Sequence, residues 1–130
     1  QQLIPASSAT RTEVAVGEFR QETRLASIFA RDGSGIVRLT ASPGDAGAPG
    51  RLLVTARAEE VGNNEGEIDA IVAGEEAKIA FNSRYLIEVL NVITTDRVAI
   101  ETSSPSAPGV LRPVGDERYV HVVMPMFVQW

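Results

Sequence analysis

The 130-residue sequence contains one order of hydrophobic patterns twice, and this duplication constrains the fold more than any other feature. In each half, a stretch of alternating apolar and polar residues precedes a segment with helical spacing, and three further alternating stretches follow. The halves cover about residues 1–75 and 76–130. The pattern predicts one α+β domain, residues 1–130, built from a duplicated β-α-β-β-β unit whose two helices pack on antiparallel sheet. An α+β domain without internal duplication is the alternative.

The same patterns place the individual elements. In the first half we expect strands at 13–16, 37–41, 52–58 and 68–73, and a helix at 18–31. In the second half we expect strands at 77–81, 98–102, 110–114 and 119–126, and a helix at 83–94, which Asn82 or Ser83 can cap. Residues 32–35, 42–50 and 62–64 are dense in turn formers and are predicted to be loops.

Composition excludes several classes of protein. There is no cysteine, so disulfides and thiolate chemistry are excluded, and this fits a reducing cytoplasm. No apolar run approaches the roughly 20 residues of a membrane helix, and the first residues lack a signal-peptide pattern, so we expect no membrane association. The single histidine, His121, and the serines lack identifiable catalytic partners, so no enzyme active site is predicted.

Charge limits how the domain can meet nucleic acid. The formal net charge is -5, so the domain as a whole should repel DNA and any contact requires a local basic stripe. Arg20, Arg24 and Arg31 share one face of the first predicted helix, and Arg84 lies on a weaker, mixed face of the second. Such a stripe suits contact with phosphates more than base readout. The alternative is an ordinary solvated helix face.

Acidic residues offer a different function. They gather at Glu59, Glu60, Glu65, Glu67, Asp69, Glu75 and Glu76. Paired carboxylates bind divalent metals or act as acid and base, so a self-contained metal-binding or hydrolytic α+β domain using residues 59–76 is the alternative function. Acids that alternate along a strand also keep an exposed sheet edge from pairing with other chains.

Three motifs resemble those of a known family. The segment Tyr-Val-His-Val-Val-Met-Pro-Met at 119–126 resembles the closing strand of the bacterial DNA polymerase III beta subunit, the beta sliding clamp family. Phe81-Asn82 resembles the family's helix start, and Gly-Val-Leu-Arg-Pro at 109–113 resembles the strand after its proline-serine loop. Gln-Leu-Ile-Pro at 2–5 is similar to the linker that enters the third clamp domain. The resemblance covers the whole chain and implies the DNA-clamp fold and the third, C-terminal domain.

The resemblance also implies a function. Clamp subunits carry three such domains and join head to tail as a homodimer ring whose helices line the hole around double-stranded DNA. The ring is a non-catalytic processivity factor for DNA replication, uses no cofactor or metal, and works in the cytoplasm at the nucleoid. Its partners are the DNA polymerase III alpha subunit, the clamp loader, translesion polymerases and repair proteins, which bind a pocket through linear motifs. A stand-alone interaction domain with the same fold is a further alternative.

Where the sequence matches the family's motifs, the resemblance also implies which residues form each site. The resemblance implies a peptide pocket formed by Gln2, Leu3, Ser106, Pro108, Val122, Met124, Pro125 and Met126. It places Arg20, Arg24, Arg31 and Arg84 on the DNA-facing helices, and Ile28 and Phe29 at the ring interface, although both apolar residues could equally belong to the core. The sequence departs from the family at Ser106, where apolar residues are commoner, and in the extension at 127–130.

Overall fold

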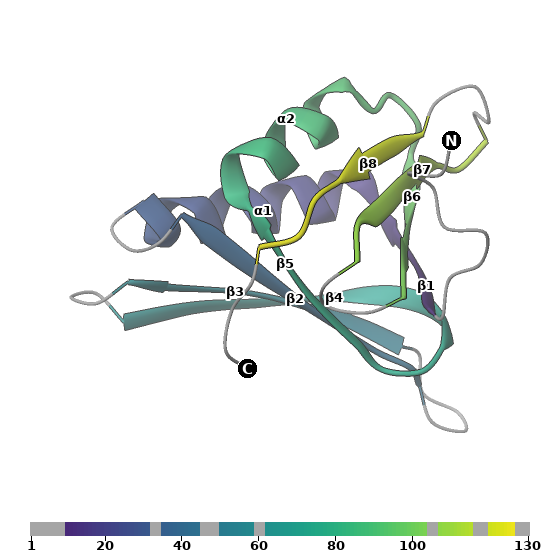
Figure 1. Ribbon diagram of the computed structural model, residues 1–130, viewed down its shortest axis with the longest axis horizontal. Helices are drawn as coiled ribbons and strands as arrows, with labels where there is room; N and C mark the ends of the chain where they lie inside the picture. Colours follow the sequence, from purple (N-terminus) through teal and green to yellow (C-terminus); the bar gives the residue numbers. More distant parts are fainter. Residues whose placement is uncertain are drawn as a thin grey trace.

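In the described part of the chain, eight strands and two helices follow one another in the order that the duplication predicts (Figure 1). The computed structural model describes residues 10–31, 35–44, 50–58, 62–103, 107–115 and 120–126. The first half comprises β1 (Thr10–Ala15), α1 (Val16–Arg31), β2 (Ile36–Ser42), β3 (Gly50–Ala58) and β4 (Gly62–Gly74). The second half comprises β5 (Ala77–Asn82), α2 (Ser83–Val92), β6 (Arg97–Thr102), β7 (Gly109–Pro113) and β8 (His121–Val123).

The strands form an antiparallel sheet in which the two halves exchange their first strands. The order is β5-β2-β3-β4-β1-β6-β7-β8. β1 lies beside β6 of the other half, with Ala15 opposite Arg97, and β5 lies beside β2, with Asn82 opposite Ile36. Met126, which follows β8, donates its backbone N–H to the carbonyl of Ala80 on β5 (2.7 Å). The chain's last described segment therefore approaches the opposite end of the strand order.

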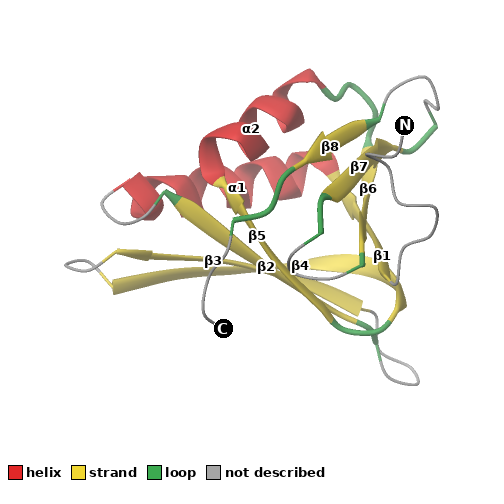
Figure 2. Ribbon diagram, in the orientation of Figure 1, coloured by secondary structure: helices red, strands yellow, loops and turns green. Residues whose placement is uncertain are grey.

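Both helices lie on the same side of the strands β2, β3 and β4 (Figure 2). Each buries a stripe at helical spacing: Phe19, Thr23 and Ala26 on α1, and Leu86, Leu90 and Ile93 at the end of α2. Asn82 caps α2, because its side-chain oxygen accepts hydrogen bonds from the backbone amides of Arg84 (2.9 Å) and Tyr85 (3.3 Å). The predicted cap is confirmed.

The core lies between the helices and the sheet. Its largest fully buried side chains include Phe19, Phe81, Leu39, Leu52 and Leu111. The start of β7 packs so closely on one of them that a Cβ at Gly109 would lie 2.6 Å from Cζ of Phe81. Glycine is therefore required where β7 begins.

The predicted order is confirmed, but most predicted boundaries shift by a few residues, and three of these shifts have a clear physical reason. Val16, expected to end a strand, begins α1, where its side chain is still buried. Residues 62–64, expected to be a loop, belong to β4, because β3 supplies a partner for each of them up to Ala58↔Gly62. β8 is shorter than expected and ends before Pro125, which has no N–H for a strand ladder.

Candidate peptide groove and nucleic-acid face

A groove of about 460 Å³ separates α2 from β8 and the residues that follow it. The helix contributes one wall and the last described segment of the chain contributes the other. The lining residues are Asn82, Tyr85, Glu88, Val89, Val92, His121, Val122, Val123, Met124, Pro125 and Met126. Most of these side chains are apolar, so the groove suits an apolar occupant.

The helix wall exists because α2 carries two apolar stripes. Leu86, Leu90 and Ile93 fill the core, whereas Tyr85, Val89 and Val92 repeat at i, i+4, i+7 on the neighbouring face. The side chains of Tyr85 and Val92 are 60% and 62% exposed. Val89 between them is half-buried and packs against the core, and all three side chains line the groove.

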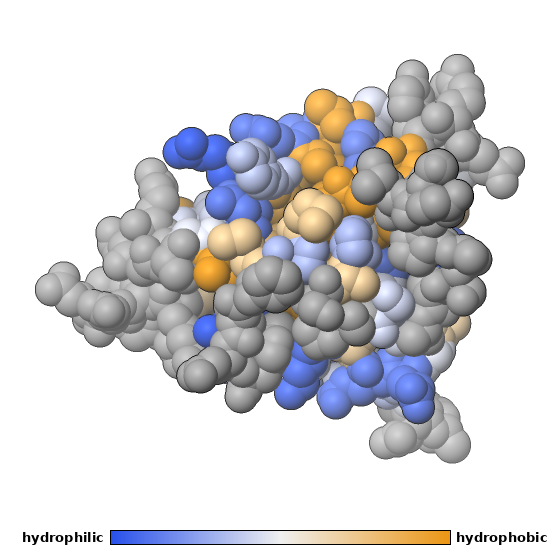
Figure 3. Space-filling view, in the orientation of Figure 1, coloured by the Kyte–Doolittle hydropathy of each residue, from blue (hydrophilic) through white to orange (hydrophobic). Residues whose placement is uncertain are grey.

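The opposite wall is formed by alternate residues after β8. Met124 is 64% exposed and Met126 is 37% exposed, whereas Val123 before them and Pro125 between them are buried. This is the alternation of an extended chain with one face on the core. Figure 3 shows hydrophobic side chains gathered over α2 and β8 in the upper part of the view.

The structure brings together part of the predicted pocket. Val122, Met124, Pro125 and Met126 all line the groove. Pro108, which precedes β7, is half-buried and does not line it. Gln2, Leu3 and Ser106 lie outside the described residues.

Sequence reasoning missed the helix wall and His121. The lining residues that were not predicted on this wall come from α2 and its N-cap: Asn82, Tyr85, Glu88, Val89 and Val92. The spacing of Tyr85, Val89 and Val92 was visible as a signal, because a helix whose core face is already complete has no structural need for a second apolar stripe.

The predicted arginine face is partly occupied by contacts between the helices. Arg20 donates from Nη2 to the carbonyls of Leu90 (2.7 Å) and Ile93 (3.4 Å). Arg24 donates from Nη2 to Oδ1 of Asn91 on α2 (3.1 Å) and remains exposed. Arg20 therefore serves first to hold the end of α2, where a cation is favoured by the orphan carbonyls and the helix dipole.

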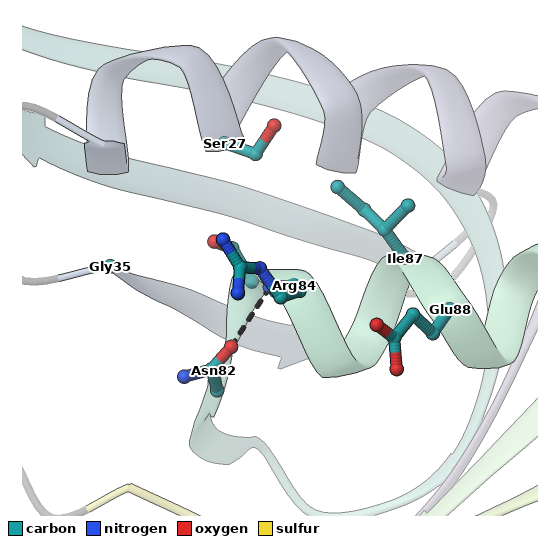
Figure 4. A pocket seen from close by; sticks show the side chains of 7 residues that line it. Ser27, Gly35, Asn82, Arg84, Ile87 and Glu88 are labelled. Carbon is teal, nitrogen blue, oxygen red and sulfur yellow. Dashed lines mark hydrogen bonds between the residues drawn. The ribbon is translucent and has the colours of Figure 1, made fainter.

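Arg84 lies exposed beside a second cavity of about 340 Å³, between the end of α1 and the start of α2 (Figure 4). Ser27 from α1 and Ile87 from α2 also line this cavity. Arg31 ends α1, and its side chain lies outside the described part of the structure. Arg24 and Arg84 are thus the two predicted DNA-facing arginines whose described side chains are exposed.

The predicted interface pair on α1 divides into two environments. Ile28 is 52% exposed, whereas Phe29 is half-buried and packs against the core. Leu25, one turn before Ile28, is also 43% exposed. An exposed apolar face on α1 therefore includes Leu25 and Ile28, whereas Phe29 packs inwards against the core.

The alternative function based on carboxylates finds no support. Glu65, Glu67 and Asp69 alternate along the exposed face of β4, and Glu67 forms an ion pair with Arg51 across the strands. Within the segments that the structure describes, no three acidic or histidine side chains gather as a metal site would require. Glu59 and Glu60 lie outside those segments.

Neither described helix combines the length and apolarity of a membrane span.

Comparisons with known proteins decide the family. Residues 1–127 match the family model of the DNA polymerase III beta subunit, C-terminal domain. The chain belongs to this family. The clamp domain is 30% identical over 126 residues to the beta sliding clamp of Staphylococcus aureus strain Mu50, covering 95% of the chain and 32% of that protein. It thus spans about a third of the length of the curated relatives it matches.

Solved clamp structures share the fold of this domain. The DNA polymerase sliding clamp of Bacillus subtilis superposes with a TM-score of 0.89 at 27% identity, over 99% of this chain and 33% of that one. The DNA polymerase III beta subunit of Thermotoga maritima gives a TM-score of 0.90 at 22% identity, over 98% and 33%. The predicted clamp fold is confirmed.

Proposed function

We propose that this chain is the third domain of a DNA sliding clamp, in which its groove captures the linear motifs of replication and repair proteins. The observation that carries the proposal is the exposure of large apolar side chains on both walls of one groove, above all Met124 and Tyr85. Apolar side chains gathered in this way mark binding surfaces, because leaving them in water is unfavourable. The occupant is a short peptide with apolar side chains.

The chemistry of the walls suits several partners. Met124 and Met126 are unbranched and polarisable, so they adapt to different apolar side chains. Tyr85 adds a large ring with a polar hydroxyl. We infer that the DNA polymerase III alpha subunit, the clamp loader, translesion polymerases and repair proteins compete for this groove.

Two open sheet edges support assembly into a ring. Among the described residues, Gly62–Ala70 of β4 pairs with β3 alone, since β1 pairs with the later residues of β4. In the described segments β8 pairs with β7 alone. β4 and β8 are equivalent strands of the duplicated unit, so one edge opens on each side of the domain. Such edges accept a neighbouring strand, and the exposed Ile28 on α1 adds apolar surface. We infer a head-to-tail homodimer in the whole protein.

The helices supply the inner surface of that ring. Arg24 and Arg84 are exposed on α1 and α2, within a chain whose net charge is -5. A local basic lining on an acidic domain favours weak, sequence-independent contact with phosphates and allows sliding. This role is mechanical, so we infer a non-catalytic subunit without cofactor, working in the cytoplasm at the nucleoid.

A peptide-binding experiment on the intact protein tests the groove. The probe is a fluorescent peptide of the Gln-Leu-x-Leu-Phe type, titrated against the protein and against the double variant Met124→Ala, Met126→Ala. We expect saturable binding that weakens at least tenfold in the variant, because two apolar contacts are removed. Ile71→Ala is the matched control, since Ile71 is 61% exposed and lies on β4, away from the groove. Equal binding by all three proteins would refute the groove assignment.

A second experiment tests the helix face. Charge reversal of Arg24 and Arg84 to glutamate in the whole protein should shorten the product length of clamp-dependent DNA synthesis and leave peptide affinity unchanged. Arg20 is left intact because it holds α2. Unaltered product length would show that these arginines do not face DNA.

A further inference from the structure

One charged residue interrupts the apolar wall that α2 presents to the groove. Glu88 lies three residues after Tyr85 and four before Val92, so the three side chains form one stripe on the helix. Figure 4 shows the Glu88 carboxylate turned away from Ser27 of α1, whereas Ile87 points towards α1. Glu88 also borders the second cavity, so it stands on the ridge between the two hollows.

The Glu88 carboxylate is available to a ligand. The side chain is exposed, and within the described residues it forms no ion pair, although Arg84 lies one turn earlier on α2. The described lining of the groove contains this one carboxylate and neither lysine nor arginine. The described part of the groove therefore has one acidic side chain in the middle of an apolar wall.

A bound peptide must meet this charge. A segment that packs on Tyr85 and Val92 necessarily passes over Glu88 and removes water from it. A neutral peptide would leave the carboxylate with fewer partners than it has in water, and an acidic peptide would add repulsion. A lysine or arginine at the matching position restores a partner and brings opposite charge to an acidic domain.

We propose that Glu88 is a specificity-determining residue, which makes the groove prefer peptides that place a cationic side chain beside their apolar anchors. This inference rests on the proposed function of the groove as a peptide site. It adds a charge rule to that function and predicts which of several apolar motifs bind most tightly.

The test uses the same peptide with lysine placed in turn before, within and after the apolar anchors, and a matched set with glutamine at these positions. We expect the best lysine peptide to bind the intact protein about fivefold more tightly than its glutamine counterpart at low salt, the order expected for a partly exposed ion pair. High salt should reduce the ratio, because exposed charges are screened.

Two variants distinguish an effect of Glu88 from a general effect of the acidic surface. Glu88→Gln should bring the lysine-to-glutamine ratio to about one, whereas Glu65→Gln, an equally exposed carboxylate on β4 outside the groove, should leave the ratio unchanged. Equal affinity for all peptides, or a lysine preference that survives Glu88→Gln, would overturn the inference while the groove stands. Failure of every peptide to bind would refute the groove itself and the inference with it.

Discussion

The two helices hold equivalent positions in the duplicated unit, but their outward faces differ. Counted from their first residues, Val16 and Ser83, the buried positions correspond: Phe19 with Leu86, Thr23 with Leu90 and Ala26 with Ile93. The groove wall of α2 is formed by Tyr85, Val89 and Val92. The corresponding positions on α1 hold Glu18, Glu22 and Leu25. The core faces repeat, whereas the outward faces carry different chemistry.

The strands beside the helices explain this difference. In the first half, β4 has 13 residues and passes so close to α1 that a Cβ at Gly66 would collide with the Glu22 carboxylate. In the second half, β8 has 3 residues and the segment Met124-Pro125-Met126 follows it, leaving a groove beside α2. The groove therefore lies where the last strand of the second half is short and the residues after it are apolar.

The largest effect is expected from the paired core positions. Phe19→Ala should lower the free energy of unfolding by about 4 kcal/mol and Leu86→Ala by about 3 kcal/mol, because both side chains are fully buried and truncation leaves a cavity. Urea denaturation of the two variants measures both values. Phe19 is the larger side chain and lies on the longer helix, which packs on β2, β3 and β4.

A larger loss of stability in the second half than in the first would contradict this prediction. If Leu86→Ala cost clearly more than Phe19→Ala, the second half would hold the domain together, and the first would be the peripheral copy. Leu25→Ala is the control, since Leu25 is 43% exposed and its loss should change stability by less than about 1 kcal/mol.

A smaller loss is expected where the two helices are tied together. Arg20→Gln should lower the free energy of unfolding by about 1.5 kcal/mol, because Arg20 donates charge-assisted hydrogen bonds to the carbonyls of Leu90 and Ile93. Arg24→Gln should change it by less than about 0.5 kcal/mol, because Arg24 is exposed and, among the described residues, its side chain bonds to the exposed Asn91. Thermal unfolding of both variants checks the difference. Equal losses would mean that Arg20 has no special role in holding α2.

Much of this architecture could be predicted from the sequence because burial imposes a period. Alternation along β1 and β2, and the repeats Phe19-Thr23-Ala26 and Leu86-Leu90, fix which residues face the core. Element boundaries depend on partners instead: residues 62–64 extend β4 only because β3 is there to pair with them. Periodicity gives no information on that pairing.

The candidate site was harder to predict because it needs two elements to meet. The methionines of the last segment were found through a family motif, but the wall opposite them comes from α2, about 35 residues earlier in the chain. The role of Arg20 was also hidden, because helical spacing shows that it shares a face with Arg24 and does not show that the end of α2 lies beneath it.

A further loss of about 1 kcal/mol is expected at the start of α2. Asn82→Ala removes the side-chain oxygen that accepts from the amides of Arg84 and Tyr85, leaving two helix-end donors without this partner. Asn82→Asp should retain most of the stability, since aspartate caps equally well. Peptide affinity should fall with Asn82→Ala as well, because the capped turn positions Tyr85 in the groove wall. A variant with full stability and full affinity would show that the cap is dispensable.

The two halves meet at two seams, where β1 pairs with β6 and where β5 pairs with β2. Where β1 meets β6, Glu13 accepts from Nε of Arg97 at 2.7 Å and from Arg11 at 3.2 Å. At the equivalent places where β5 meets β2, the residues are Ala80 and Ile36. At these positions the first seam carries an ion pair and the second carries apolar side chains, so protonation of Glu13 has no counterpart at the same positions of the second seam.

The smallest predicted effect is the pH dependence of the seam between β1 and β6. The hydrogen bond from Arg97 lowers the pKa of Glu13 below its ordinary value, with Arg11 contributing and partial burial opposing it. A carboxylate with a lowered folded-state pKa stabilises the protein fully above its unfolded pKa of about 4.3, and this stabilisation is lost as pH falls through the folded value. At pH 7, Glu13→Gln should therefore be less stable than the natural sequence by up to about 1 kcal/mol. The difference should shrink as the pH of urea titrations is lowered from about 5 towards 3, and Arg97→Gln should reproduce it because it removes the main partner. A difference between Glu13→Gln and the natural sequence that is constant from pH 7 to pH 3 would mean that the ion pair contributes nothing to the stability of this seam.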